Sequence, residues 1–186
     1  MKPHPQRKSP RLKGYDYTSD GAYFVTICTQ ERYLLFGNVV NSEMRHDSLG
    51  ALARHHWLDL PNHFDTVELD YFVVMPNHFH GIVVINNYLY EKVETGLTPT
   101  TNPIVGDAPV RPTKTKYPTL GLIIGSFKAA VTREARKQNI FTGKIWQRNY
   151  HDHIIRDEDD LNRLRQYVVY NPAKWEEDRF YRETNL

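Results

Sequence analysis

Two histidines separated by one residue, His78 and His80, are the first side chains in this sequence that could carry chemistry. The β-branched and apolar residues of segment 78–85 predict a strand. Side chains alternate along a strand, so both imidazoles point to one side and Phe79 points to the other. Two imidazoles on one face can bind the same metal ion, and the turn at residues 76–77 leaves them at a sheet edge that a ligand can approach. The alternative is a pair of ordinary histidines on a polar strand face.

A second pair with the same spacing, His151 and His153, competes with the first. Asp152 lies between them, so the strand would direct a carboxylate to the face that the histidines avoid. Phe79 is a proper core residue and Asp152 is not. We therefore favour His78 and His80 as the metal pair, and interpret the second pair as surface or groove contacts.

Tyr167 and Asn171 lie four residues apart, so a helix places them on the same face, one turn from each other. They lie on one shoulder of a predicted apolar stripe, where a tyrosine can meet the sheet and still be reached by a ligand. The alternative is an amphipathic boundary tyrosine without a chemical role. On pattern alone, three other tyrosines are equally open candidates: Tyr117, Tyr150 and Tyr170.

The elements that must position these side chains follow from the spacing of apolar residues. Strands are predicted at residues 22–29, 34–40, 66–75 and 78–85, the last two as a hairpin, with residues 145–155 extended. Helices are predicted at residues 42–63, 119–138 and 157–170. This order predicts an α+β fold with an antiparallel sheet and helices packed on one face.

Length and composition limit the class of protein. At 186 residues, with 40% hydrophobic and 25% charged residues, the chain predicts one folded domain and excludes wholesale disorder. Cys28 is the single cysteine, which excludes an intramolecular disulfide and a zinc site built from several cysteines. No apolar stretch reaches the roughly 20 residues of a membrane span, and the N-terminus does not read as a signal peptide. A cytoplasmic protein is expected.

The domain is expected at residues 19–176, with a Pro- and Thr-rich mobile linker at residues 86–118. Residues 1–18 are expected to form a basic flexible tail, and residues 177–186 a C-terminal tail.

The net charge of +2 hides two basic segments. Residues 1–14 carry five basic residues and no acid, and residues 111–148 carry nine basic residues against one glutamate. Clusters of this kind favour a polyanion as partner. A solubilising tail and a solvated helix face explain the charge equally well.

Five motifs in one order resemble a known family. They are Val-Val-Met-Pro-Asn-His-Phe-His (73–80), Ser-Phe-Lys (126–128), Trp-Gln-Arg-Asn-Tyr (146–150), His-Ile-Ile-Arg-Asp (153–157) and Tyr-Val-Val-Tyr-Asn-Pro-Ala-Lys-Trp (167–175). Together they resemble the REP-associated tyrosine transposases, single-tyrosine members of the HUH transposases. The resemblance runs from about residue 23 to residue 175, and it rests on the order of five motifs rather than on the histidine pair alone.

The resemblance implies a ferredoxin-like fold and a role for each matched residue. His78 and His80 match the family's histidine pair, Tyr167 matches its nucleophile, and Asn171 matches a polar third metal ligand. An amide oxygen suits a hard cation, and the implied metal is Mg²⁺ or Mn²⁺.

The implied activity is that of a single-stranded DNA endonuclease and strand transferase. It cleaves and rejoins DNA at palindromic repeats that fold as hairpins, through a covalent 5′-phosphotyrosine intermediate. A homodimer is a further possibility that the resemblance raises, as is association with the nucleoid when the protein is bound to DNA.

With such a substrate, the basic segments become candidate DNA contacts. The helix at 119–138 offers charges for phosphates, and the segment after it adds a donor and an aromatic ring that could stack on bases. Trp146 is expected more strongly as a core residue. The candidate DNA-binding residues are Lys128, Arg133, Arg136, Lys137, Trp146 and Arg148.

Two other functions remain open at this point. One is a DNA-binding regulator that has kept the fold but lost turnover. The other is a DNA- or RNA-binding module whose histidines bind no metal. Usable chemistry at all four matched positions argues against both.

Overall fold

The computed structural model describes residues 14–87 and 117–182. The linker predicted at residues 86–118 and the basic segment at residues 1–14 therefore lie almost wholly outside the described residues.

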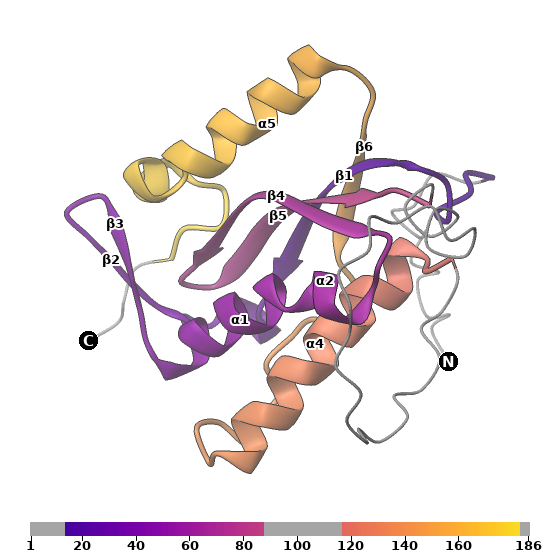
Figure 1. The fold of residues 1–186 in the computed structure, drawn as a ribbon. Helices are drawn as coiled ribbons and strands as arrows, with labels where there is room; N and C mark the ends of the chain where they lie inside the picture. Colours follow the sequence, from indigo (N-terminus) through magenta and orange to yellow (C-terminus); the bar gives the residue numbers. More distant parts are fainter. Residues whose placement is uncertain (1–13, 88–116, 183–186) are drawn as a thin grey trace, which may run out of the picture.

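The centre of the molecule is a four-stranded antiparallel sheet (Figure 1). Its strands are β1 (Gly21–Cys28), β4 (Val67–Met75), β5 (His78–Ile85) and β6 (His151–Ile155), in the spatial order β4-β5-β1-β6. The crossovers between β1 and β4 and between β5 and β6 each carry helix. This is the βαββαβ arrangement of a ferredoxin-like fold, which confirms the predicted class.

Helices cover both faces of this sheet, as Figure 1 shows. The helices α1 (Ser48–Leu58), α2 (Leu60–His63) and α4 (Leu120–Lys137) lie on one face, where the main core includes Trp57, Phe79 and Phe127. The last helix, α5 (Glu158–Tyr170), packs on the other face through Leu164 and Val168. The prediction that helices pack on one face of the sheet therefore holds for the helices of the ferredoxin-like unit. It is wrong for α5, which packs on the opposite face.

A short ribbon replaces the beginning of the helix predicted at residues 42–63. Strands β2 (Gly37–Val40) and β3 (Glu43–His46) pair around Asn41 and Ser42, whose φ angles are 52° and 64°. Two consecutive left-handed residues make the tight turn of a hairpin, which apolar spacing alone does not reveal. Helix α1 begins only after Asp47, whose side chain accepts a hydrogen bond from the Gly50 amide.

The two ends of the described chain correct the predicted domain boundaries. Tyr15 and Tyr17 pack against the main core, although they fall within the tail predicted at residues 1–18. A 3-10 helix, η2 (Pro172–Glu177), follows α5, and beyond it the ring of Phe180 is only 3% exposed. Residues 177–182 therefore belong to the folded domain and not to a tail.

The register of the sheet determines which side chains face α5. A two-residue turn joins β4 to β5, with Met75 opposite His78. Thr26 lies opposite His80 on one side and opposite His151 on the other. Because residues directly opposite each other share a face, both histidine pairs lie on the face that α5 covers.

Candidate active site

The imidazoles of His78 and His80 lie side by side between the sheet and the C-terminal part of the chain. Their ring centroids are 4.5 Å apart, and both side chains are fully buried. Phe79 points into the opposite core, as predicted. The alternation of one strand therefore brings the two predicted ligands together.

Asn77 determines which nitrogen of His78 is free. Its Nδ2 donates to the carbonyl oxygens of Arg32, at 3.3 Å, and Phe180, at 2.8 Å, so its Oδ1 must act as an acceptor. His78 Nδ1 lies 2.9 Å from that oxygen and therefore carries the proton. The lone pair of His78 Nε2 is left available to a ligand. A hydrogen bond to the remote nitrogen is how metal-binding histidines are commonly oriented.

His80 is held in the same way and faces the tyrosine. Its Nδ1 lies 2.8 Å from the hydroxyl of Thr26, and its Nε2 lies 3.3 Å from the hydroxyl of Tyr167. Phe24 stacks on the imidazole with a centroid separation of 5.2 Å. Both predicted ligands thus present Nε2 to the same space.

Both histidines are held in the neutral form. Burial lowers the pKa of His78 to about 3, and the positive charges of Arg179 and Arg32 contribute to the shift. Burial also lowers the pKa of His80 well below its ordinary value, with a further contribution from His78. Neutral imidazole is the form that binds metal, so no proton has to be displaced at neutral pH.

Tyr167 reaches the histidines from α5. Its ring contacts His80 and Phe24 at centroid distances of 5.1 and 6.0 Å, and 40% of the residue remains exposed. Burial, and then the negative charge of Asp178, raise the pKa of the phenol. The hydroxyl is therefore protonated at neutral pH, and the residue that carries it is partly open to solution.

Asn171 and Asp178 complete the site. Asn171 is almost fully buried, and its Nδ2 donates to Asp178 Oδ2 at 3.1 Å. Asp178 also forms a group with His78 and His80 in which one potential ligand atom from each side chain lies within 4.8 Å of the others. Within residues 14–87 and 117–182 this is the one group of three such side chains that could hold a metal.

The donor set fits a divalent cation. Two buried atoms at its centre, His78 Nε2 and Asn171 Oδ1, have no hydrogen-bond partner among the described residues. Unpaired buried polar atoms are costly, and a cation bound by His78 and Asn171 would satisfy both. Two imidazole nitrogens, an amide oxygen and a carboxylate suit Mn²⁺, or Mg²⁺ with more oxygen ligands.

Sequence reasoning missed Asp178, Asn77 and the two arginines near the site. Asp178 lay in a segment interpreted as a tail, and Asn77 in a segment interpreted only as a turn. The signal that could have identified the first is the aromatic Phe180 two residues later, because a buried ring brings its neighbours into the fold.

The second histidine pair lies on the same face but away from the metal ligands. His151 and His153 are exposed and line a cavity of about 490 Å³ at the β6 edge. His153 Nε2 is 2.6 Å from a carboxylate oxygen of Asp160. This position suits the groove contacts expected for the pair.

Several predicted DNA-binding residues line one groove. It has a volume of about 710 Å³ and lies between α4 and residues 144–148, with five basic side chains along it: Lys128, Arg133, Arg136, Lys144 and Arg148. Lys144 was not predicted. Lys137 does not line the groove, and its amine lies 3.6 Å from Glu134.

Lys128 and Trp146 also make contacts that stabilise the fold. The Lys128 amine donates to the carbonyl oxygens of Gln147, at 2.7 Å, and Arg148, at 3.1 Å, and burial lowers its pKa to about 8. Trp146 is buried against Phe36 and Phe127. This burial agrees with the core position that was expected more strongly, and because Trp146 also lines the groove, its part in DNA binding stays a prediction.

Among the described residues, no helix is long and apolar enough to cross a membrane.

Comparison with known proteins connects this site to a family. No family model matches the chain. An uncharacterised protein of Haemophilus influenzae is 41% identical over 176 residues, covering 94% of this chain and 93% of that protein. A second protein of that organism, provisionally named REP-associated tyrosine transposase, is 24% identical over 168 residues, covering 86% of this chain and 74% of that protein.

A solved structure shares the fold. It is a REP-associated tyrosine transposase bound to a REP hairpin, with a TM-score of 0.55 and 18% identity, covering 88% of this chain and 73% of that one. The chain belongs to one family with the uncharacterised Haemophilus influenzae protein, and its resemblance to the REP-associated tyrosine transposases is confirmed.

Proposed function

We propose that this protein is a metal-dependent endonuclease and strand transferase for single-stranded DNA. It cleaves and rejoins strands at palindromic repeats folded as hairpins, with Tyr167 as nucleophile and a covalent 5′-phosphotyrosine as intermediate. The observation that carries the proposal is the distance of 3.3 Å between the Tyr167 hydroxyl and His80 Nε2. Two buried ligand atoms of the same site have no hydrogen-bond partner in the described part of the chain.

In the proposed reaction, the phenolic oxygen of Tyr167 attacks the scissile phosphorus. The phosphotyrosyl bond forms, the bond from phosphorus to the 3′-oxygen breaks, and that oxygen takes up a proton to leave as a 3′-hydroxyl. The phenol loses its proton during the attack, and Asp178 Oδ2, 3.5 Å from the hydroxyl, is within reach of it. A 3′-hydroxyl attacking the phosphotyrosine reverses these steps, so rejoining needs no nucleotide cofactor.

His78, His80 and Asn171 would hold the cation, with Asp178 as a further oxygen ligand. When bound, Mg²⁺ or Mn²⁺ supplies Lewis-acid polarisation of the scissile phosphate and offsets its developing charge. The protein contributes the orientation of both imidazoles through Asn77 and Thr26, and the attachment of the nucleophile to a packed helix.

Substrate recognition is proposed for the groove beside α4. Its positive side chains suit phosphates on the backbone of a hairpin. The hairpin bound to the structural relative supports this class of substrate for the present chain. A cytoplasmic location, at the nucleoid when bound to DNA, follows from such a substrate, and a homodimer is a further part of the proposal.

The test is a covalent adduct. Single-stranded genomic fragments labelled at the 3′ end are incubated with the protein and Mn²⁺ and run on a denaturing gel, because the 5′-phosphotyrosine retains the 3′ side of the cut. We expect a labelled protein band with the natural chain and none with Tyr167→Phe, and sequencing of the trapped DNA identifies the hairpin. Tyr170→Phe is the matched control, since Tyr170 lines the same cavity as Tyr167.

The result also decides between the proposed enzyme and the catalytically idle regulator. Hairpin binding without any adduct would favour the regulator. An adduct that persists in Tyr167→Phe and disappears in Tyr170→Phe would transfer the role of nucleophile to Tyr170.

A further inference from the structure

Two arginines that the proposed chemistry does not use, Arg32 and Arg179, lie beside the metal-binding side chains. Their guanidinium carbons lie over the ring of Phe180, 4.9 and 4.6 Å from its centroid. Phe180 is itself in contact with the His78 ring at 4.7 Å. One buried ring therefore positions both positive charges next to the histidines.

The backbone at Arg32 is held in an unfavourable conformation. Glu31 and Arg32 have φ angles of 51° and 58°, in the left-handed region that side chains other than glycine rarely adopt. The Arg32 amide donates to the carbonyl of Thr29 at 3.1 Å, and the Arg32 carbonyl accepts from Asn77. The same asparagine orients His78, so the strained turn and the metal ligand share one support. Strain of this kind clusters at functional sites.

Both arginines open onto the cavity of about 490 Å³ at the β6 edge, which we term the strand-edge cavity. Thr26, His151 and His153 also line it. The Thr26 hydroxyl contacts His80 Nδ1, so the floor of the cavity lies directly behind a metal ligand. A ligand in this cavity would therefore be a neighbour of whatever binds at His80 and Tyr167.

Two arginines line the cavity against one carboxylate, Asp152, whose Oδ2 accepts a hydrogen bond from Tyr17, so the net charge favours an anion. Arg179 and Arg32 both act on the imidazole of His78 and help to lower its pKa, after the larger effect of burial. Guanidinium groups bind phosphate through paired N–H donors, and the hydroxyl and imidazoles along the wall are further polar groups. The volume falls within the range of small-ligand sites.

We propose that the strand-edge cavity binds a backbone phosphodiester of the single strand next to the one that is cleaved, with Arg32 and Arg179 as its charged ligands. That the bound strand is the DNA to be cleaved rests on the proposed function, whereas the presence of a phosphodiester site does not. A phosphodiester bound there holds the strand on one side of Tyr167. The next phosphodiester along the strand, which is the scissile one, is thereby positioned at the tyrosine.

The experiment uses the smallest probe with one phosphodiester, the dinucleotide dTpdT, in EDTA. Binding is followed by NMR through the Cε1–H signals of His151 and His153, assigned with His151→Gln and His153→Gln. We expect saturable shifts with dTpdT and an affinity at least tenfold lower for its uncharged methylphosphonate analogue. Inorganic phosphate is a third arm, and equal binding of phosphate and dTpdT would contradict a nucleic-acid site.

Arg32→Asn with Arg179→Gln should weaken dTpdT at least tenfold. Asparagine tolerates a positive φ, so the turn is retained. The matched control, Arg45→Gln with Arg54→Gln, removes the same charge at two exposed positions outside this cavity and outside the groove beside α4, and should bind as the natural protein does. Unchanged binding in the arginine variant, or no shift in the natural protein, would overturn the proposal. Neither readout depends on adduct formation, so loss of the proposed function would be recognised separately.

Discussion

At the scale of single residues, the site depends on two imidazoles kept neutral in a position where water cannot reach them. His78 has a proton on Nδ1 because Asn77 offers only an acceptor, and this makes Nε2 the atom that faces the ligand space. Burial lowers the pKa of both imidazoles in the folded chain, so the free energy of unfolding depends on pH.

Lowering the pH should destabilise the metal-free protein between pH 7 and pH 5. The unfolded chain takes up a proton at His78 near pH 6.5, whereas the folded chain does not do so until about pH 3. Stability is therefore lost as the pH falls below the unfolded pKa, by about 2 kcal/mol over this window for His78. His80 adds a loss of the same sign. Urea denaturation in EDTA at a series of pH values measures the effect.

The control for this experiment is a pair of exposed histidines. His78→Gln with His80→Gln should flatten the dependence, and His151→Gln with His153→Gln should leave most of it in place. An equally steep dependence in the first variant would show that other groups cause it.

Single ligand substitutions should separate the two histidine pairs. His78→Ala and His80→Ala should each reduce Mn²⁺ affinity at least tenfold and reduce adduct formation correspondingly, because each removes an Nε2 ligand. His151→Ala and His153→Ala should leave Mn²⁺ affinity unchanged and act on DNA binding. Isothermal titration calorimetry with Mn²⁺ measures the affinity of each variant. If the His78 variant bound the metal and the His151 variant did not, the second histidine pair would be the metal ligands.

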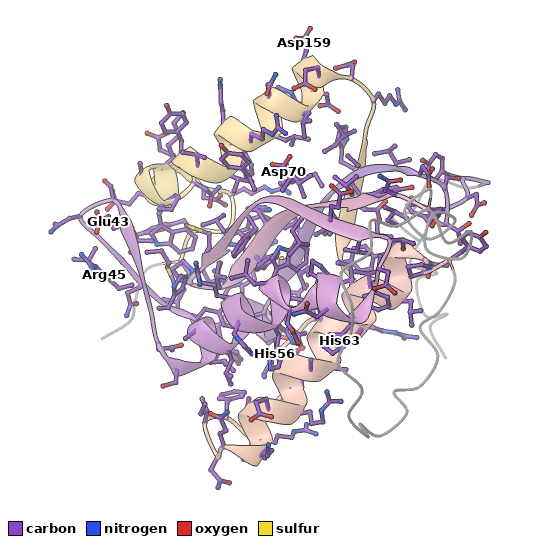
Figure 2. All side chains as sticks on the ribbon, in the orientation of Figure 1. Glu43, Arg45, His56, His63, Asp70 and Asp159 are labelled. Atoms are coloured by element: carbon purple, nitrogen blue, oxygen red, sulfur yellow. The ribbon has the colours of Figure 1, made fainter. Side chains whose placement is uncertain are left out.

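At the scale of elements, an arginine–aspartate ion pair attaches α5 to the sheet in addition to its apolar face. Arg165 donates from Nε and Nη2 to the carboxylate of Asp70, with a shortest distance of 2.6 Å. Asp70 lies on β4, toward the helix (Figure 2). The pair fixes the rotation of the helix and hence the direction of Tyr167.

Arg165→Lys should slow adduct formation several-fold while leaving hairpin binding and the melting temperature nearly unchanged. Lysine keeps the charge but cannot form the paired hydrogen bonds. The measurement is the initial rate of adduct formation. Arg163→Lys, on the same helix, is the control, and an equal loss of rate in both variants would exclude a specific effect of orientation.

The basic groove beside α4 leads to a prediction about DNA affinity. Neutralising Arg133, Arg136, Lys144 and Arg148 together should reduce the logarithmic salt slope of hairpin binding by up to about 2.8, at roughly 0.7 for each single-strand phosphate contact. Fluorescence anisotropy at several salt concentrations measures it. Lys137→Gln is the control because Lys137 lies outside the groove. An unchanged slope in the quadruple variant would place the DNA elsewhere.

Sequence patterns predicted the elements whose periodicity is regular. The hairpin at residues 66–85 and the helices at 119–138 and 157–170 have long apolar repeats, and the structure has them within a few residues. The strand predicted at residues 34–40 is confirmed in part as β2, whereas the turn and β3 at residues 41–46 were missed because the turn depends on φ angles and not on hydrophobicity. Glu43 and Arg45 of β3 are exposed (Figure 2), so Met44 is the single apolar side chain of the strand, and one residue makes no alternating pattern.

Strand alternation and helical spacing predicted one part of the candidate site. His78 and His80 share a face by parity, and Tyr167 and Asn171 share one by the helical repeat. Asp178 comes from a segment with no repeat, and its position depends on the burial of Phe180. Tertiary packing of irregular segments leaves no periodic signal in a sequence.

At the scale of the whole molecule, the candidate metal ligands come from three parts of the chain. His78 and His80 lie on β5, Asn171 at the end of α5, and Asp178 beyond η2. A cation bound by all of them would link the C-terminal segment to the centre of the sheet, so metal binding and global stability are coupled.

Mn²⁺ should therefore stabilise the protein against unfolding. At a free concentration of one hundred times Kd, we expect a gain of about 2.7 kcal/mol. Thermal or urea denaturation with and without the metal measures it. His78→Ala should remove most of the gain, and a gain that persists in His78→Ala but is lost in His151→Ala would contradict the proposed ligand set.

The length of the two-residue turn between β4 and β5 matters to the site. An insertion in this turn affects the site differently from a substitution. One extra residue after Met75 that the turn did not absorb would shift β5 by one position against its neighbours, and its side chains would exchange faces. The imidazoles would then point at Trp57 and Phe127, and Phe79 would take the place beside Tyr167. Substitutions around the ligands can weaken the site by degrees, but a change of length here removes it at once. Any engineering of specificity in this chain should therefore graft sequence onto the ends of the sheet that carry no ligand, and keep the number of residues between Met75 and His78 constant.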